Sequence, residues 1–308
     1  MITDRIPVIF DTDIGSDMDD TWALAQFLRS PELDPQLILT EAGDSGYRSR
    51  IVAKFLQLSG RTEVPVGCGV PVTDAPLPAR NQAPWVVGYA LADYPGEIVE
   101  DGVERMIELI DASPVPVTII AIGPAINLAA ALERAPGIAS RCRLVGMFGS
   151  FDLGYHEQAP AVAESNVRNA PEALRRVLSA PWRDILITPL DSCGSVILDG
   201  ANYRRVWSAT DDPMLRSIIE NYCFFASRVS WMHCDFFALR SSILFDCVAV
   251  YLAYAEDLLE IEQIRFDVSD DGFTRRHEQG AFSARVALRW RDLGAFHTHL
   301  TARLLGEV

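Results

Sequence analysis

The sequence predicts an α/β fold, with a doubly wound, mostly parallel sheet in a Rossmann-like core and helical additions toward the C-terminus. Short apolar runs alternate with longer segments of helical periodicity up to about residue 200. The apolar runs lack the polar alternation of half-exposed strands, which is typical of strands buried on both faces of a parallel sheet. The expected strands are Ile6–Phe10, Gln36–Thr40, Val64–Cys68, Val115–Ile122, Arg143–Phe148 and Ile185–Leu190.

Residues that begin or end helices mark the segments between these strands, which favours strand–helix–strand crossovers. Asp19–Arg29 begins with two acidic residues, which stabilise a helix N-terminus, and it ends before Pro31. Gly60 suits the position just after a helix over Ser49–Ser59. Proline suits the first position of a helix over Pro171–Leu178. Two further helices are expected at Asp101–Ala112 and Ile126–Arg134.

The pattern changes after about residue 200, where aromatic residues and helical spacing dominate. Two late apolar segments are expected as strands that form a hairpin-like addition at the sheet edge. We see no linker, low-complexity stretch or internal repeat, so residues 1–308 are expected to form a single domain. The expected helices are Asp211–Leu239 (one or two helices), Leu244–Ala255 and Gly294–Leu305, and the expected late strands are Ile261–Val268 and Ser283–Trp290.

The charge balance narrows the classes of partner. Lys and Arg number 27 against 42 Asp and Glu, which gives a formal net charge of −15. Such a surface repels phosphate backbones, so it argues against nucleic acid and favours a small neutral or cationic ligand or a divalent metal. No run reaches the roughly 18 apolar residues that span a bilayer, and no secretory signal is visible. We therefore expect a cytoplasmic protein with no membrane partner. The six cysteines form no C-x-x-C pair, so we expect free thiols rather than a zinc site or disulfides.

The most distinctive feature is a cluster of five aspartates in the ten residues from Asp11 to Asp20, directly after the first expected strand. Ligands of such sheets bind beyond the carboxyl ends of the strands. Carboxylates a few ångströms apart raise one another's pKa, and a hard divalent cation removes this conflict. Asp19 and Asp20 can also cap the free N–H groups of the helix that they begin. Capping accounts for one or two of the acids, so the cluster predicts a metal or catalytic site.

The segment from Phe10 to Leu24, FDTDIGSDMDDTWAL, resembles the N-terminal signature of the inosine–uridine nucleoside hydrolases, D-x-D-x-G-x-D-D-x-x-A-L. It carries two extra residues between Gly15 and the final Asp-Asp pair, a spacing associated with divergent members. Together with three later segments it covers most of the chain up to about residue 255 and implies a nucleoside-hydrolase-like fold. The later segments, similar to family motifs in the same order, are Ile120–Ala130 (IAIGPAINLAA), Ala161–Ala173 (AVAESNVRNAPEA) and Ser242–Leu252 (SILFDCVAVYL).

This resemblance implies hydrolysis of the N-glycosidic bond of a ribonucleoside or a related ribosyl compound, with one Ca²⁺ at the base of the pocket. The ligands of the calcium would be the carboxylates of Asp13, Asp20 and Asp246 and the main-chain carbonyl of Ile126. All of these are oxygen donors, as calcium requires. Asp13 would also be the catalytic general base, because it would take a proton from a calcium-bound water that attacks the anomeric carbon. The family resemblance further suggests a homodimer or homotetramer.

The resemblance also implies a set of substrate-binding residues. Asp19 matches the acid that holds the ribose 2′-hydroxyl, and Glu164 and Asn166 match a pair that binds other ribose hydroxyls. Asp44 stands where the family usually places an asparagine, and Met147 matches a residue that lines the sugar pocket. Carboxylates and amides suit vicinal diols, because burial of such groups without partners would cost several kcal/mol.

The chain departs from the family pattern at the residue just before its last expected calcium ligand. Phe245 stands there, whereas many members carry a histidine that protonates the leaving base; the phenyl ring can instead stack on a flat base. His233 is a candidate for the missing acid, and His156, in a loop ahead of Glu164, could reach the mouth of the pocket. Gln158 stands where an asparagine ribose ligand is expected. Asp17, within the two-residue insertion, is ambiguous between a supporting residue and a solvated one.

Two other functions compete with this hypothesis. A phosphatase of the haloacid-dehalogenase type also carries D-x-D after its first strand, but Gly15 stands where that motif has threonine or valine. The second alternative is a nucleoside- or sugar-binding protein with lost or weak turnover, which Phe245 supports and the presence of Asp13 opposes.

Overall fold

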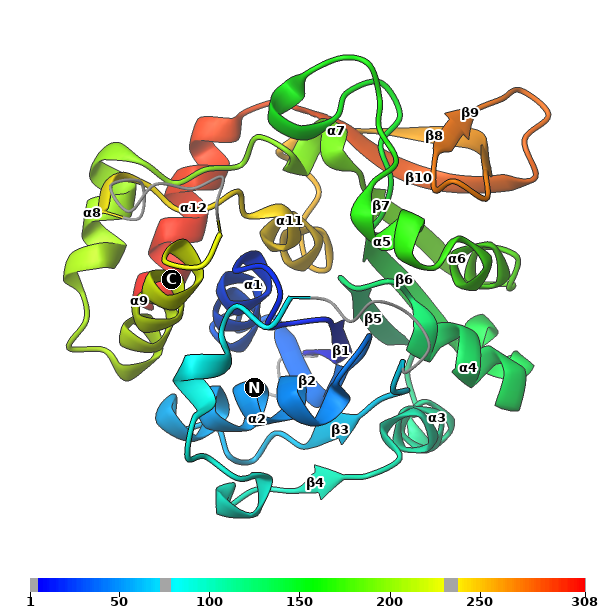
Figure 1. The fold of residues 1–308 in the computed structure, drawn as a ribbon. Coiled ribbons are helices and arrows are strands. Elements are labelled where there is room, and N and C mark those ends of the chain that lie inside the picture. Colours follow the sequence, from blue (N-terminus) through cyan, green and yellow to red (C-terminus); the bar gives the residue numbers. More distant parts are fainter. Residues whose placement is uncertain (1–4, 73–78, 230–237, 308) are drawn as a thin grey trace.

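The computed structural model describes residues 5–72, 79–229 and 238–307, which are built around one ten-stranded sheet (Figure 1). The strands are β1 (Ile6–Thr12), β2 (Leu33–Thr40), β3 (Val66–Cys68), β4 (Ile98–Val99), β5 (Val117–Ala121), β6 (Cys142–Met147), β7 (Asp184–Thr188), β8 (Leu259–Val268), β9 (Thr274–Arg276) and β10 (Phe282–Trp290). Their order in the sheet is β4-β3-β2-β1-β5-β6-β7-β10-β8-β9. Neighbouring strands from β4 to β10 are parallel, and β8 is antiparallel to both β10 and β9.

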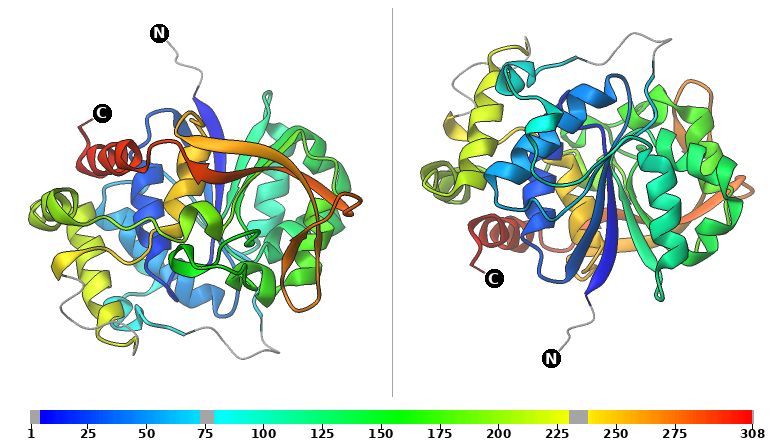
Figure 2. Two further views of the ribbon diagram at one scale, coloured as in Figure 1. Left: turned by 90° about the horizontal axis from the view of Figure 1, so that it is seen from above. Right: turned by 90° about the horizontal axis from the view of Figure 1, so that it is seen from below.

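Helices cover both sides of this sheet, as the two views in Figure 2 show. Successive residues of β1 enter different cores: Phe10 packs with the helices of one side and Ile9 with those of the other. The helices on the first side are α1 (Asp19–Leu28), α2 (Ser45–Leu58), α8 (Gly200–Ser208), α9 (Pro213–Ala226), α11 (Phe245–Leu252) and α12 (Leu293–Leu305), and those on the second are α3 (Gly102–Ala112), α4 (Ile126–Arg134) and α6 (Pro171–Leu178). Shorter helices are α5 (Ser165–Asn169), α7 (Leu190–Cys193), and the 3₁₀ helices η1 (Ala83–Val86), η2 (Leu91–Asp93), η3 (Pro136–Arg141) and η4 (Tyr155–Glu157).

The predicted fold class is confirmed, including the mostly parallel sheet and the helices near the C-terminus. Each of the six strands expected before residue 200 overlaps an observed strand. α2 begins at Ser45, earlier than expected, because the Asp44 carboxylate accepts the Tyr47 N–H at 2.8 Å and caps the helix. β3 is shorter than expected and begins at Val66. The two-residue strand β4 was not expected from the sequence.

The late strands pair as an antiparallel unit, as predicted, and β10 joins this unit to β7 of the parallel sheet. α9 accounts for the first part of the expected aromatic-rich helical segment, whereas residues 230–237 of that segment lie outside the described residues. The five cysteines in the described ranges are free thiols. None of the helices in these ranges is both long enough and apolar enough to cross a membrane.

The strand order places the crevice for a ligand at β1 and β5, which are neighbours in the sheet. β1 is followed by α1 on one side of the sheet, and β5 is followed by α4 on the other side. The two connections therefore diverge, and open α/β sheets bind ligands at such a point, beyond the carboxyl ends of the strands. The aspartate cluster follows β1 directly and so lies at this crevice.

Candidate active site

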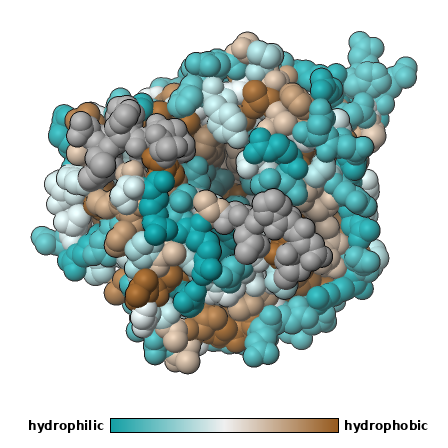
Figure 3. Space-filling view, viewed as in Figure 1, coloured by the Kyte–Doolittle hydropathy of each residue, from teal (hydrophilic) through white to brown (hydrophobic). Residues whose placement is uncertain are grey.

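A cavity of about 190 Å³ lies at the carboxyl ends of the parallel strands. Figure 3 shows a hollow near the middle of this face of the molecule. The walls come from four distant parts of the chain: the loop from β1 into α1, the residue after β5, the segment from the end of β6 into α5, and the first turn of α11. The lining residues are Asp13, Ser16, Asp17, Asp19, Asp20, Ile122, Met147, Tyr155, Glu164, Ser165, Asn166, Phe245 and Asp246.

The loop between β1 and α1 contains a glycine, Gly15, and is held by side chains that donate hydrogen bonds to its carbonyl groups. Gly15 adopts a φ of +116°, and a Cβ built there would come within 2.8 Å of side-chain atoms of both Ile51 and Tyr47. The Tyr47 hydroxyl donates to the Gly15 carbonyl at 2.9 Å, and the Gln82 side chain donates to the Asp17 carbonyl at 2.9 Å. A glycine is therefore required at this turn, and the loop presents its aspartates in a fixed arrangement.

Three buried carboxylates form the densest negative charge in the cavity. One oxygen each from Asp19, Asp20 and Asp246 lies within 4.8 Å of the others. Burial, together with the charges of neighbouring carboxylates, raises the pKa of each of these groups well above its ordinary value. Ionised together, these buried carboxylates repel one another. A hard divalent cation would relieve this repulsion and satisfy the oxygens, so the donor set fits Ca²⁺ chemically.

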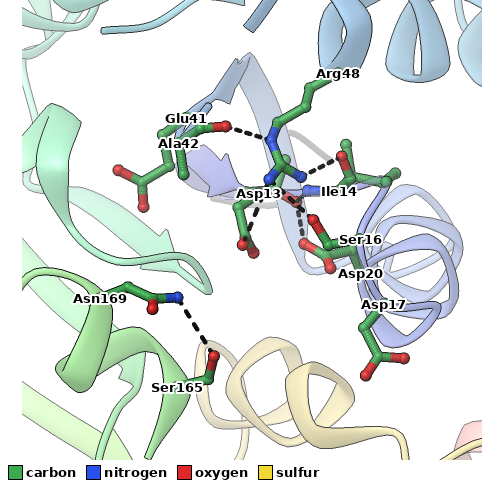
Figure 4. A network of polar contacts seen from close by, with 12 residues as sticks. Asp13, Ile14, Ser16, Asp17, Asp20, Glu41, Ala42, Arg48, Ser165 and Asn169 are labelled. Carbon is green, nitrogen blue, oxygen red and sulfur yellow. Dashed lines mark hydrogen bonds and ion pairs between the residues drawn. The ribbon is translucent and has the colours of Figure 1, made fainter. Parts of the chain in front are cut away.

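Asp13 lies beside this triad and faces the buried, positively charged side chain of Arg48. The Arg48 guanidinium lies 3.9 Å from the Asp13 carboxylate, and its other N–H groups donate to the carbonyls of Ala42 at 2.6 Å and Ile14 at 2.7 Å (Figure 4). Burial raises the pKa of Asp13, and the charge of Arg48 opposes that shift. The Asp20 carboxylate, in turn, accepts a hydrogen bond from the hydroxyl of Thr12. Asp13 is thus positioned by its ion pair with Arg48, and Asp20 by its hydrogen bond with Thr12.

Asp17 belongs to the same loop but points elsewhere. Figure 4 shows its carboxylate turned away from those of Asp13 and Asp20. It accepts the Met18 N–H at 2.6 Å, and burial raises its pKa to about 6. Asp17 lines both this cavity and a neighbouring one. The structure therefore places Asp17 on a wall of the cavity rather than in the carboxylate triad.

The opposite wall carries the expected hydroxyl-binding pair. The Glu164 carboxylate accepts three main-chain N–H groups, from Gly149 at 3.0 Å, Asn166 at 2.7 Å and Val167 at 3.2 Å. Burial raises its pKa to about 7, although these hydrogen bonds oppose the shift. The Asn166 amide donates to the Met147 carbonyl at 3.1 Å. Each side chain is thus fixed by the loop that carries it and faces the cavity from the side opposite the aspartates.

Three other residues predicted for the site do not line this cavity in the described parts of the chain. Asp44 caps α2 and forms an ion pair with Arg80 at 3.1 Å. Ile126 is the first residue of α4, and the Gln158 carbonyl accepts the Gly154 N–H at 2.8 Å. His156 and Phe245 both line the neighbouring cavity, and Phe245 lines the main one as well. His233 lies outside the described residues.

Several residues at the site had no signal in the sequence. Arg48 looks like an ordinary surface arginine of α2, yet it is 2% exposed. Ser16, Ile122, Tyr155 and Ser165 line the cavity because the topology brings their loops together. Ser16, Ile122 and Ser165 lie within the segments that resemble family motifs, but nothing there marks them as lining residues, and Tyr155 lies outside these segments. Their loops could have been anticipated only from the strand ends that they follow.

A buried polar layer lies beneath the aspartate loop. Asn127 donates from its side chain to the Asp11 carboxylate at 2.7 Å, and its N–H donates to Glu41 at 3.0 Å. Glu41 also accepts the N–H of Ala125 at 2.9 Å. Asp11 is 0% exposed, so it cannot act as the nucleophile that a haloacid-dehalogenase phosphatase would need at this position. Its carboxylate instead links β1 to α4 through the hydrogen bond from Asn127.

Comparisons with known proteins agree with this geometry. Residues 8–296 match the family model of the inosine-uridine preferring nucleoside hydrolases. The non-specific ribonucleoside hydrolase RihC of Escherichia coli (strain SE11) is 32% identical over 204 residues, which cover 63% of this chain and 64% of RihC. The pyrimidine-specific ribonucleoside hydrolase RihA of Citrobacter koseri is 32% identical over 233 residues, or 71% of each chain. The match thus spans less than two thirds of RihC.

Solved structures share the fold. A plant nucleoside hydrolase, PpNRh1, superposes with a TM-score of 0.80 at 22% identity, over 97% of this chain and 99% of its own. The inosine-uridine preferring nucleoside hydrolase from Bacillus anthracis gives 0.78 at 19% identity, over 99% and 100% of the two chains. Because the family model covers nearly the whole sequence, the chain belongs to the inosine-uridine preferring nucleoside hydrolase family.

Proposed function

We propose that this protein hydrolyses the N-glycosidic bond of a ribonucleoside or a related ribosyl compound in a calcium-dependent reaction. The observation that carries the proposal is the cavity itself, in which Asp13 adjoins the triad of Asp19, Asp20 and Asp246. The relatives named as ribonucleoside hydrolases support the substrate class. We further propose a single domain over residues 1–308 that assembles as a homodimer or homotetramer.

The carboxylates of Asp13, Asp20 and Asp246 would hold the cation, and the main-chain carbonyl of Ile126 is the fourth ligand that the family resemblance implies, although Ile126 does not line the cavity. The crowding of buried carboxylate oxygens supports this assignment, since their mutual repulsion calls for a positive charge. Bound calcium would supply that charge and make a nearby water more acidic. Asp19 adjoins the same oxygens, which supports a role for it beside the cation and in binding the sugar.

Asp13 serves as the general base in this mechanism. Its carboxylate accepts a proton from the attacking water, and the water oxygen forms a bond to the anomeric carbon as the N-glycosidic bond breaks. Arg48 keeps Asp13 oriented through its contacts with the loop and opposes the rise in the pKa of that carboxyl. The base therefore remains ionised over a wider pH range than burial alone would allow.

Asp19, Glu164 and Asn166 would bind the ribose hydroxyls. Acceptors from two opposite walls of the cavity can orient a furanose ring only if the sugar lies between them, above the aspartate loop. The three main-chain donors on Glu164 fix the orientation of its carboxylate before substrate arrives. Such preorganisation reduces the entropy lost on binding.

A panel of ribonucleosides, assayed for release of reducing sugar with calcium and with a chelator, tests the proposal. We expect release from at least one ribonucleoside, loss of release in the chelator, and recovery when calcium is restored. Calorimetry on the same panel separates the alternative of a binding protein, which would bind nucleoside without any release of sugar. Release of phosphate from an aryl phosphate ester would instead indicate a phosphatase and would contradict the proposal.

A further inference from the structure

A second cavity of about 290 Å³ opens beside the candidate active site. Asp17, Tyr155 and Phe245 line both cavities and form their common wall. A ligand whose sugar lies above the aspartates can therefore extend directly into the second cavity. The second cavity is lined by Asp17, Tyr155, His156, Ser242, Ile243 and Phe245.

Two aromatic side chains, Tyr155 and Phe245, contribute to the wall of this second cavity. The rings of Tyr155 and Phe245 lie 5.8 Å apart at 86° to each other, in an edge-to-face contact between η4 and α11. This contact joins two segments that are distant in sequence and fixes the wall between the cavities. A wall that combines aromatic and aliphatic side chains with a few polar groups suits a planar heterocycle such as a nucleobase.

A nucleobase that departs from C1′ carries away the electrons of the N-glycosidic bond, so it leaves more readily when one of its nitrogens is protonated. Phe245 has no proton to give. Burial raises the pKa of Tyr155 to about 12, which makes its hydroxyl a poor acid. Among the described residues that line either cavity, His156 is the one histidine. Histidine is the side chain that most often donates protons near neutral pH.

The backbone around His156 is held in a costly conformation. His156 and Glu157 have φ angles of 59° and 57°, in the left-handed region, which costs a non-glycine residue roughly 1–2 kcal/mol. Two contacts hold them there: the His156 N–H donates to the Gly194 carbonyl at 3.0 Å, and Ser195 donates to the Glu157 carboxylate at 2.9 Å. Strain of this kind persists where the surrounding structure imposes it, and it gathers at functional sites.

We infer that the second cavity binds the leaving base and that His156 is the acid that protonates it, in place of the histidine that Phe245 replaces. This role rests on the proposed function. An imidazolium N–H of His156 gives its proton to a ring nitrogen of the base, which takes up the electron pair of the broken C1′–N bond. The water oxygen bonds to C1′, and Asp13 accepts the proton of that water. The products are the free sugar and a neutral base, and solvent returns the two proton carriers to their starting states.

The test compares two kinds of substrate in the calcium-loaded protein. Inosine and uridine release bases that need a proton, whereas 4-nitrophenyl riboside releases a phenolate that is stable without one. His156→Asn removes the acid and retains the left-handed backbone, which asparagine tolerates well. His277→Asn is the matched control, because His277 lies outside both cavities. Circular dichroism of each variant reports its folding.

We expect His156→Asn to lower kcat on the better of the two nucleosides by about 100-fold, the usual contribution of a general acid. The same variant should hydrolyse 4-nitrophenyl riboside at nearly the wild-type rate, and His277→Asn should match the wild type on both substrates. An equal loss on both substrates would show that His156 only supports the loop. Unchanged nucleoside hydrolysis would show that the acid lies elsewhere. A wild-type protein that cleaves neither 4-nitrophenyl riboside nor any ribonucleoside of the panel would overturn the proposed function itself and this inference with it.

Discussion

The Arg48 guanidinium lies 3.9 Å from the Asp13 carboxylate and is almost completely buried. It is the cation nearest to Asp13 among the ion pairs of the described residues, and it binds the main chain of two loops at once. The pair thus links the end of β2 to the aspartate loop after β1. Arg48 therefore orients Asp13, the expected general base, and opposes the rise in the pKa of its carboxyl group.

Arg48→Met should destabilise the fold by about 3–5 kcal/mol, because removal of one partner leaves buried carbonyls and a carboxylate without their donors. Denaturant unfolding in calcium-free buffer measures this change. Arg50→Met, on the same helix and outside the cavity lining, is the matched control. A loss below about 1 kcal/mol would mean that solvent replaces Arg48 in its contacts.

Asp13→Asn should reduce kcat by a factor of 10² to 10⁴, which is the usual contribution of a general base. The amide retains the shape of the side chain but cannot accept the proton of the attacking water. Nucleoside binding, measured by calorimetry, should persist. Asp270→Asn provides a control, since the Asp270 side chain is 94% exposed. Turnover that survives in Asp13→Asn would assign the base to another residue.

Calcium should stabilise the protein against heat, and this effect should depend on Asp246. In a chelator the carboxylates of Asp19, Asp20 and Asp246 repel one another, so the melting temperature should fall and then recover when calcium is added. Asp246→Asn should melt higher than the wild type in the chelator, because one charge is gone, and should respond little to calcium. A calcium response equal to that of the wild type would place the cation elsewhere.

The pKa of Glu164 gives a pH dependence of stability. Burial raises that pKa to about 7, whereas a glutamate in the unfolded chain titrates near about 4.3. The folded state therefore binds more protons over that range, and the stability from the protonated carboxyl is complete below about pH 4 and is lost as the pH rises through about 7. Glu164→Gln should make the fall in unfolding free energy between about pH 5 and 8 shallower, by at most about 1.4 kcal/mol per pH unit. Denaturant titrations at several pH values in a chelator measure the slope, and an unchanged slope would contradict the prediction.

Phe245→His should raise the rate on nucleosides and leave the rate on 4-nitrophenyl riboside nearly unchanged. The new imidazole would stand next to Asp246 on the wall shared by both cavities, within the space that a leaving base would occupy. Combined with His156→Asn, it should restore part of the lost nucleoside activity. Steady-state rates of the two single variants and the double variant measure the coupling. If the double variant is no faster than His156→Asn alone, a histidine at position 245 cannot protonate the base.

The sequence predicted the order of the strands and helices well because buried parallel strands and helix ends leave local signals. The apolar run before Asp11 and the acids that begin α1 placed the aspartate cluster at a strand end, and the structure puts it at the divergence of β1 and β5. Asp246 entered the prediction only through a family motif. Spacing alone could not have brought it beside Asp20.

The remaining parts of the site depend on tertiary contacts that leave no local pattern. Arg48 is buried because two carbonyls and a carboxylate surround it, and nothing in the sequence of α2 distinguishes it from Arg50. Asp44 is predicted to bind substrate by its place in the family pattern, and the structure adds a contact that this pattern does not mark, the cap of α2. Tyr155 lines both cavities because its loop folds back against α11, a contact between segments about ninety residues apart.

The carboxylate triad combines residues near the start of the chain with one from its last quarter, so no N-terminal fragment that ends before residue 246 contains all three. During synthesis, the aspartates that follow β1 would emerge long before Asp246. They would repel one another until α11 is synthesised and packs beside them. Because the proposed cation would need Asp246 as well as Asp13 and Asp20, its binding would report that α11 is in place. A nascent chain stalled before α11 would lack that cation-dependent protection from proteases, and the full-length chain would have it.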